Sequence, residues 1–407
     1  MSPTRSSDRA PGESAPENPS AGGKHGKHRL RDSWRRVTEG LELSDLWGQF
    51  AREAREGYGL YSREVDWDAV RSAKSWKRPY RAAKALFWAM VLKLSPARRV
   101  LLVIALVLLL LSTVSVDSDH RNNAFFRLDA GGLAAVILFV LLALELADRV
   151  TMKRDLQIAR EIQSWLIPAE PPVTPGFEIA FTTRPANTVS GDYYDAFWRA
   201  TSDTGIGDVQ PWPGRKLLLV VADVAGKSVP AALLMATLQA SLHSLAEVPS
   251  TLEELVARLD QYVCAHSSEG RRFTTAFLAE LDTTTRGMHY VNAGHNAPIL
   301  RRHSGQIERL ELGGVPLGVD PSRTYETGSV ALQPGDALFV FTDGVIEAVN
   351  DAGQEFGEPK LVQIVENFVP SSAAELRDRA MGAVEAYVGD ARQHDDITCL
   401  VLRVLSS

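Results

Sequence analysis

Cysteine is scarce in this chain of 407 residues, which contains only Cys264 and Cys399. The two lie far apart and outside any C-x-x-C spacing, so the sequence supports neither a disulfide framework nor a zinc site. This composition is typical of a protein from a reducing compartment. The net charge of −6 at pH 7 is modest, so the overall charge gives no reason to expect a nucleic acid as a partner.

Apolar side chains are almost absent from residues 1–28, where Pro, Gly, Ser and charged residues dominate. A segment of this composition cannot bury enough surface to offset the entropy lost on ordering. We therefore predict a disordered tail. Arg5 and Arg9 are not followed by an apolar core, so the tail does not have the pattern of a cleavable signal peptide.

Acidic residues are absent from 71–99, at the end of a region (29–98) without a visible motif. Such a basic run suits the anionic cytoplasmic face of a bilayer, so we interpret 29–98 as a cytosolic juxtamembrane region of unknown role. Its apolar stretch is interrupted by Lys84 and Lys93 and is too short to span, which favours an interfacial helix. The alternative is a solvated helix that packs on a neighbouring domain.

Two long apolar runs follow within 99–148. The first, 100–116, is uncharged, and about 17 residues at 1.5 Å each give about 26 Å, the low end of what a spanning helix needs. The second, 131–147, carries one charge, Glu145, near its end. Either run alone is compatible with a buried core helix, but two such runs flanked by charges predict two transmembrane helices in a lipid bilayer.

The segment between the two runs is about a dozen residues long, too short for a sensor domain of its own. Basic residues crowd the N-terminal flank of the first run, and Arg149, Lys153 and Arg154 follow the second. By the positive-inside rule, both termini then lie in the cytoplasm and the protein sits in the inner or plasma membrane. We expect the C-terminal half to face the cytosol.

Residues 149–168 have the pattern of an amphipathic helix that ends at Pro168. It can pair with its copy in a homodimer or clamp the next domain, and a passive spacer is the alternative. The apolar positions lie at spacings near three and four: Val150, Leu156, Ile158, Ile162, Trp165 and Leu166.

Residues 169–407 alternate short β-rich runs with helical patterns and predict one mixed α+β domain. One helix opens at Pro230, and another begins at Thr251 with Glu254 three residues later, the spacing of a capping box. The predicted strands are FEIAFTT, KLLLVVAD, FTTAFLAEL, MHYVNAG, ALFVFTD and TCLVLRV.

Acidic residues end or adjoin four segments of this domain. If strands aim several carboxylates at one point, bound cations must neutralise them. Oxygen ligands select Mg²⁺ or Mn²⁺ over zinc. Any one segment is weak by itself, because an Asp-Gly pair is more often only a turn. The segments are SGDYYD (Asp192, Asp195), VVADVAGKS (Asp223), FVFTDGV (Asp343) and QHDDIT (Asp395, Asp396).

The order of the motifs is more specific than any one of them. GD-x-x-D, D-x-x-G-K-S-x-P-A-A-L-L-M, N-A-G-H-N, T-D-G-V-x-E and D-D-x-T follow one another between about 157 and 404. This set resembles the PPM family of metal-dependent protein phosphatases, in particular its bacterial branch of RsbU-like and SpoIIE-like regulators. The resemblance implies an αββα sandwich of two mainly antiparallel sheets flanked by helices.

The resemblance also implies site residues for two Mn²⁺ or Mg²⁺ ions. Asp223 would bridge the ions, with the carbonyl of Val224 as a further ligand. Asp192 would hold one ion, and Asp223 and Asp192 would be the residues closest to catalysis. Asp343 and Asp395 would hold the other ion. Asp396 stands beside Asp395, where the wider family often has asparagine, and is included among the metal candidates.

Three further residues have competing interpretations. Lys227 can contact the substrate phosphate or be a solvated turn residue; its GKS triplet is not a phosphate-binding P-loop, because Val221 stands where that motif needs glycine. His295 can be a general acid or, more simply, a hydrogen-bonded structural histidine. Arg184 is the nearest candidate for the phosphate-binding arginine of eukaryotic relatives, but it lies at a different distance from the first motif.

The resemblance therefore predicts a phosphatase for phosphoserine or phosphothreonine on a cytosolic protein, with water activated by the metal ions as the nucleophile. Kinship with the bacterial branch implies an anti-anti-sigma regulator with a STAS fold as substrate, and regulation through the helix at 150–167. A catalytically inactive, membrane-tethered binding module and a metal-dependent phosphodiesterase are the competing hypotheses.

Overall fold

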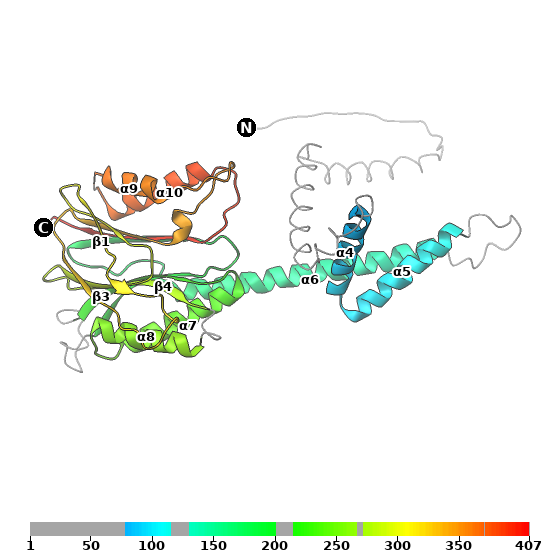
Figure 1. Ribbon diagram of the computed structural model, residues 1–407, viewed down its shortest axis with the longest axis horizontal. Helices are drawn as coiled ribbons and strands as arrows, with labels where there is room; N and C mark the ends of the chain where they lie inside the picture. Colours follow the sequence, from blue (N-terminus) through cyan, green and yellow to red (C-terminus); the bar gives the residue numbers. More distant parts are fainter. Residues whose placement is uncertain (1–77, 115–129, 201–214, 267–271, 370, 407) are drawn as a thin grey trace, which may run out of the picture. The chain divides into compact units, whose positions relative to one another are not determined.

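A computed structural model describes residues 78–114, 130–200, 215–266, 272–369 and 371–406 (Figure 1). Two compact units divide between Glu145 and Leu146. The predictions for the tail at 1–28, for residues 29–77 of the basic region and for the segment between the two apolar runs lie outside the described residues.

The first unit consists of helices in its described part. They are α4 (Arg78–Lys93), α5 (Pro96–Val114) and the first part of α6 (Ala130–Leu166). The run 100–116 falls largely in α5 and the run 131–147 in α6, so both are helical as predicted. An ion pair of 3.4 Å joins Arg98 of α5 to Glu145 of α6.

Two of the described helices are long and apolar enough to cross a membrane, α6 and α7 (Val229–Ala246). They differ in where their apolar side chains lie. In α6, Phe139 is 71% exposed and Leu142 is 66% exposed, whereas Met235 and Leu242 of α7 are fully buried in the second unit. The apolar residues of α7 therefore belong to a domain core. Apolar side chains of α6 are instead exposed on the surface of the first unit.

The second unit contains two sheets. The first has the strand order β1-β11-β10-β6-β7, and the second has the order β2-β3-β4-β5-β8, with β9 also paired to β5. All pairs are antiparallel except β5 with β8. The strands are β1 (Phe177–Arg184), β2 (Asp192–Ala200), β3 (Arg215–Val224), β4 (Thr274–Leu281), β5 (Gly287–Ala293), β6 (Ile299–Arg301), β7 (Ile307–Arg309), β8 (Gly313–Gly314), β9 (Gly328–Ala331), β10 (Ala337–Phe341) and β11 (Ile397–Val404).

Helices cover the outer face of each sheet. Figure 1 shows α7 and α8 (Leu252–His266) on one side of the two sheets, and α9 (Glu358–Glu366) and α10 (Ala373–Val388) on the other. This confirms the predicted α+β sandwich with the layer order αββα. All six predicted strands are also confirmed.

Three apolar cores hold the layers together. In β3, Leu217 and Leu219 face the other sheet, while Leu218 and Val220 face α7 and α8. A strand buried on both faces has a continuous apolar sequence, and this is why the run KLLLVVAD predicts β3 so clearly. A third core lies between the first sheet and helices α9 and α10.

Helix starts follow the predicted capping pattern. Thr251 and Glu254 form the capping box before α8: the Thr251 backbone N–H donates to the Glu254 carboxylate, and the Glu254 N–H donates to the Thr251 hydroxyl, both at 3.2 Å. Two orphan donors of the first turn are thereby satisfied. Pro230 lies in the first turn of α7, as predicted.

Residues of the predicted linker helix continue α6 without a break as far as Leu166. Gln163 near its end is buried and exchanges two hydrogen bonds with the backbone of Ser190, at 2.7 and 3.0 Å. Ile167 packs against two of the three cores. The end of α6 is thus attached to the loop that leads into β2.

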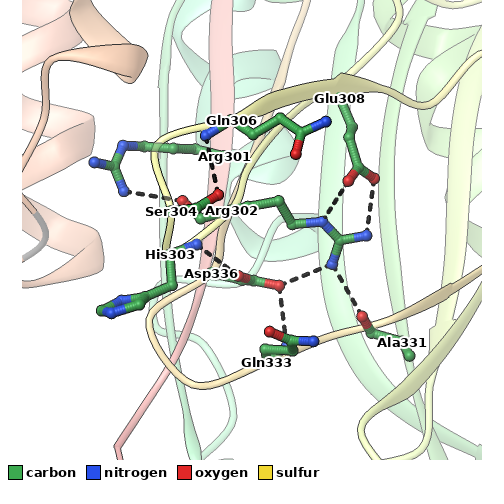
Figure 2. Close-up of polar contacts among 9 residues, drawn as sticks. All are labelled: Arg301, Arg302, His303, Ser304, Gln306, Glu308, Ala331, Gln333 and Asp336. Carbon is green, nitrogen blue, oxygen red and sulfur yellow. Dashed lines mark hydrogen bonds and ion pairs between the residues drawn. The ribbon is translucent and has the colours of Figure 1, made fainter.

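A polar network fixes the connection between β6, β7 and the turn before β10 (Figure 2). The Arg302 guanidinium donates to Glu308 at 2.7 and 2.8 Å and to Asp336 at 2.9 Å. Asp336 is almost fully buried and also accepts from the backbone N–H of His303 at 2.8 Å and of Gln333 at 3.0 Å. Because a buried carboxylate is costly without partners, these bonds make the turn a rigid support for β10.

Candidate active site

Two of the predicted site aspartates face each other across neighbouring strands. Asp192 is the first residue of β2, and it lies directly opposite Asp223, near the end of β3. Directly opposite residues project to the same face of a sheet, and two like charges in this arrangement repel. On the other side of β3, Thr275 of β4 is paired with Asp223 and therefore projects to the same face of the sheet.

The other aspartates come from the other sheet. Asp343 follows β10 and opens a short 3₁₀ turn, η4 (Asp343–Val345), while Asp395 and Asp396 immediately precede β11. The Thr342 hydroxyl donates to the Asp192 carboxylate at 2.9 Å and so joins the two sheets at this point. The predicted convergence of the four acidic segments is therefore present for these aspartates, at the end of the sandwich where the sheets meet.

Burial and neighbouring carboxylates raise the pKa values of three of these aspartates. Burial, followed by the charges of Asp343, Asp395 and Asp396, raises the pKa of Asp223 to about 7 from its ordinary value of 3.8. Burial and the charge of Asp223 raise the pKa of Asp192 well above the same value. Burial and Asp395 likewise raise the pKa of Asp343. The cluster holds more negative charge than its surroundings stabilise, and a bound cation would compensate for it.

Asp396 has a different environment from its neighbours. Its Oδ1 accepts from the Ala186 backbone N–H at 2.7 Å, and its Oδ2 accepts from the Gly191 N–H at 2.7 Å and the Ser190 hydroxyl at 2.8 Å. Both oxygens of this carboxylate are thus occupied in holding the loop before β2. Ser190 is the residue that Gln163 also binds, so Asp396 and α6 fix the same loop.

Two glycines of the site lie where a side chain would meet neighbouring oxygen atoms. A Cβ on Gly191 would lie 3.2 Å from the Val224 carbonyl oxygen and 3.9 Å from Oδ1 of Asp223. A side chain there would cover the two oxygen atoms that the resemblance assigns to a metal ion. A Cβ on Gly344 would lie 2.0 Å from the Asp396 carbonyl oxygen, so the Asp343-Gly344 pair is required by close backbone approach and is more than a turn signal.

The donor set fits hard divalent ions. It consists of carboxylate and carbonyl oxygens, which Mg²⁺ and Mn²⁺ prefer. Within the described parts of the chain, however, no three His, Cys, Asp or Glu side chains already stand in a closed metal-binding arrangement.

Lys227 lies at the rim of the cluster, whereas Arg184 does not. The Lys227 ammonium donates to Oδ2 of Asp395 at 2.8 Å and to the His394 carbonyl at 2.9 Å. Arg184, at the end of β1, forms an exposed ion pair of 2.8 Å with Glu385 of α10. Of the two phosphate-contact candidates, Lys227 is thus the one beside the carboxylates.

His295 has the environment of a structural histidine. It is buried, its Nδ1 lies 3.0 Å from the Thr275 hydroxyl, and its backbone N–H donates to the Asn292 side chain at 2.7 Å. Burial lowers the pKa of His295 to about 4, so the imidazole is neutral at physiological pH. A neutral imidazole has no proton of the acidity that a general acid needs near pH 7.

Asp195, the second aspartate of the first motif, points away from the cluster. Its carboxylate accepts from the Tyr193 hydroxyl and lies beside Nε2 of His243 on α7, both at 2.7 Å. Asp192 and Asp195 are three positions apart, and residues at an odd spacing along a strand face opposite sides of the sheet. Asp195 therefore connects β2 to α7.

A cleft beside the cluster includes a residue that the sequence analysis did not assign to the site. Glu347, the last residue of the T-D-G-V-x-E motif, lines this cleft, and burial together with Asp343 raises its pKa. The motif spacing was the available signal for it. The lining of the cleft includes Lys227, Gly344, Glu347, Gln393, His394 and Asp395.

Comparison with known proteins agrees with this geometry. The sequence profile of the family Stage II sporulation protein E (SpoIIE) matches residues 213–405. Protein IcfG of Synechocystis sp. is 26% identical over 289 residues, which cover 64% of this chain and 43% of IcfG. Phosphoserine phosphatase RsbU of Bacillus subtilis is 27% identical over 253 residues, covering 62% of this chain and 70% of RsbU.

Among solved structures, the SiaA-PP2C domain of Pseudomonas aeruginosa has the same fold. It matches with a TM-score of 0.52 and 22% identity, covering 63% of this chain and 98% of that domain. The chain spans less than half of IcfG, so the match concerns the C-terminal domain and not the whole of that relative. Residues 213–405 thus lie in a SpoIIE-family phosphatase domain of the PP2C (PPM) type.

Proposed function

We propose that the chain is a membrane-anchored, metal-dependent phosphatase for phosphoserine or phosphothreonine on proteins. The observation that carries this proposal is the convergence of Asp192, Asp223, Asp343 and Asp395 from two sheets, beside a cleft that Asp395 lines. Two relatives, RsbU and RsbP of Bacillus subtilis, are named phosphoserine phosphatases. A family domain whose acidic residues are intact and clustered supports an enzyme more than an inactive binding module.

The residues divide into two groups around the proposed ions. Asp192, Asp223 and the Val224 carbonyl would hold one Mn²⁺ or Mg²⁺, and Asp343 and Asp395 would hold the second, with Asp223 shared. When bound, such a pair of ions supplies activated water and neutralises phosphoryl charge.

The surrounding groups position the carboxylates. Thr342 orients Asp192 through its hydroxyl, and Asp396 keeps Gly191 against the Val224 carbonyl. Both groups hold oxygen atoms at places where a divalent cation would bind. Preorganised positions of this kind save reorganisation during the reaction.

The substrate proposal follows from the cleft and from kinship. The cleft lies beside the cluster, and we propose that it receives a phosphorylated side chain from a protein surface. From the resemblance to the RsbU-like branch, we propose a cytosolic anti-anti-sigma regulator with a STAS fold as the phosphoprotein. No nucleic acid is part of this proposal.

Purified full-length chain in detergent tests the enzyme claim. With a phosphoserine peptide of the STAS regulator, we expect phosphate release with Mn²⁺ or Mg²⁺ and none after chelation by EDTA. Release that continues unchanged in EDTA would exclude the proposed mechanism. Peptide binding without any release under all metal conditions would favour the binding module.

Membrane anchoring is proposed from the two apolar helices and their charged flanks. Leu110 of α5 and Leu142 of α6 are each 66% exposed. A helix that exposes large apolar side chains over many turns is unfavourable in water. We propose that α5 and the first half of α6 span the bilayer, with both termini in the cytoplasm. Residues 29–98 and 149–168 would then lie on the cytosolic side.

Reporter fusions test this topology. A reporter at Asp117 and one at the C-terminus are expected to lie in opposite compartments. One span precedes Asp117, which places it outside the cytosol, and two spans precede the C-terminus, which returns it to the cytosol. Removal of residues 100–116 is expected to reverse the C-terminal reporter. Identical signals from the two intact fusions would mean that the helices do not both cross.

We also propose that the linker part of α6 pairs with its copy. Ile158, Ile162 and Trp165 are 46%, 48% and 73% exposed and recur at spacings of four and three, so they form an apolar stripe on one helix face. A second copy is the simplest cover for such a stripe. Sedimentation of the detergent-solubilised chain at twice the monomer mass would support the pairing, and monomer mass would contradict it.

A further inference from the structure

The placement of the Lys227 ammonium depends on an unusual turn. Lys227 lies between Gly226, with φ of 127°, and Ser228, with φ of 65°. Ser228 precedes α7 with ψ of −148°, a backbone region that residues with a side chain rarely occupy. This turn directs the Lys227 side chain from the start of α7 toward the strand end that carries Asp395.

Asp395 is engaged by Lys227 at the oxygen that faces the cleft. Oδ2 accepts from the ammonium at 2.8 Å, while Oδ1 accepts from the backbone N–H of Asp396 at 3.0 Å. A lysine ammonium is positively charged at physiological pH. In this position it lies against a carboxylate that is proposed to hold a metal ion.

We infer that Lys227 is an internal counter-ion of Asp395 that competes with a divalent ion for this carboxylate and, once displaced, presents its ammonium to the substrate phosphate. This inference rests on the proposed phosphatase function. A divalent ion that binds Asp395 must displace the ammonium or approach it against repulsion, since both are positively charged. The released side chain stays at the cleft, because Lys227 itself lines the cleft beside Glu347 and His394.

Two opposite effects of one substitution follow from this double role. Lys227→Gln removes the competing charge, so the dissociation constant for Mn²⁺ is expected to become about tenfold smaller. The same variant loses the ammonium that meets the phosphate, so KM for the phosphoserine peptide at saturating Mn²⁺ is expected to rise about tenfold. If Lys227 only held the His394 backbone in place, Lys227→Gln would loosen the segment that carries Asp395. The dissociation constant for Mn²⁺ would then become larger instead of smaller.

The experiment uses full-length chain in detergent, with Mn²⁺ affinity measured by isothermal titration calorimetry and the fold checked by thermal melting. Lys153→Gln is the matched control: it makes the same charge change at an exposed position of α6 and is expected to leave both constants unchanged. Lys227→Arg keeps the charge and is expected to leave the Mn²⁺ dissociation constant within about threefold of wild type.

Unchanged or weaker Mn²⁺ binding by Lys227→Gln would overturn the inference, as would equal changes in the Gln and Arg variants. If Lys227→Gln does not fold, Lys227→Met serves in its place with the same expected results. The outcomes also distinguish the phosphatase function from the role of Lys227. Wild-type chain that neither binds Mn²⁺ nor releases phosphate contradicts the proposed function, whereas an active wild type without tighter Mn²⁺ binding in the variant contradicts only the role of Lys227.

Discussion

Replacement of Asp223 by asparagine is expected to lower phosphoserine hydrolysis by about a thousandfold. Asp223 lies directly opposite Asp192, and burial together with the charges of Asp343, Asp395 and Asp396 raises its pKa. The amide has nearly the same shape but no negative charge to share between two cations. The measurement is the initial rate of phosphate release by full-length chain at saturating Mn²⁺.

Thermal melting separates this loss from misfolding. Without metal, Asp223→Asn is expected to be at least as stable as wild type, because it removes a buried charge that its neighbours repel. Asp390→Asn, the same change at an exposed aspartate after α10, is expected to leave both the rate and the melting temperature unchanged. A rate for Asp223→Asn within threefold of wild type would contradict the assignment of this residue.

The second large effect concerns pH. In EDTA, the free energy of unfolding of the C-terminal domain is expected to fall as pH rises from about 4 to about 7. Burial and the neighbouring aspartates raise the pKa of Asp223 to about 7, above its ordinary value of 3.8. Across this window the folded state keeps a proton that the unfolded state has lost, so each pH unit costs at most about 1.4 kcal/mol for such a group.

The raised pKa of Asp192, caused by burial and by Asp223, acts in the same direction. Melting curves of full-length chain at several pH values in EDTA measure the slope, and the Asp223→Asn variant is expected to show a shallower one. Added Mn²⁺ at pH 7 is expected to restore the lost stability, since the ion binds the folded state only. An equal slope in wild type and variant would show that the cluster does not cause it.

Strand prediction succeeded where burial is simple. Among the strands that it missed, β2 has buried polar groups that are paired across the fold. β3 and β11 are continuous apolar runs because both faces of each are covered. β2 was not among the predicted strands, since its sequence includes Asp195 and Arg199. Both side chains are buried, and Arg199 forms an ion pair of 3.0 Å with Glu280 of β4. No local pattern in β2 reveals a partner so distant in the sequence.

The site could be predicted only in part for a similar reason. The ordered motifs indicated which aspartates belong together, and their convergence follows from the antiparallel pairing of β2 with β3 and of β10 with β11. The separation of Asp195 from Asp192 was predictable from strand alternation. The hydrogen bonds of Asp396 and the pairing of Lys227 with Asp395 were not, because they depend on how loops from both sheets fold against each other.

The central claim is that these aspartates bind two divalent cations at one end of the sandwich. Anomalous diffraction from crystals of the protein soaked in Mn²⁺ tests it most directly. We expect two manganese peaks, one against Asp192, Asp223 and the Val224 carbonyl and one against Asp343 and Asp395. Diffraction at full Mn²⁺ saturation with no peak among these oxygen atoms would contradict the account.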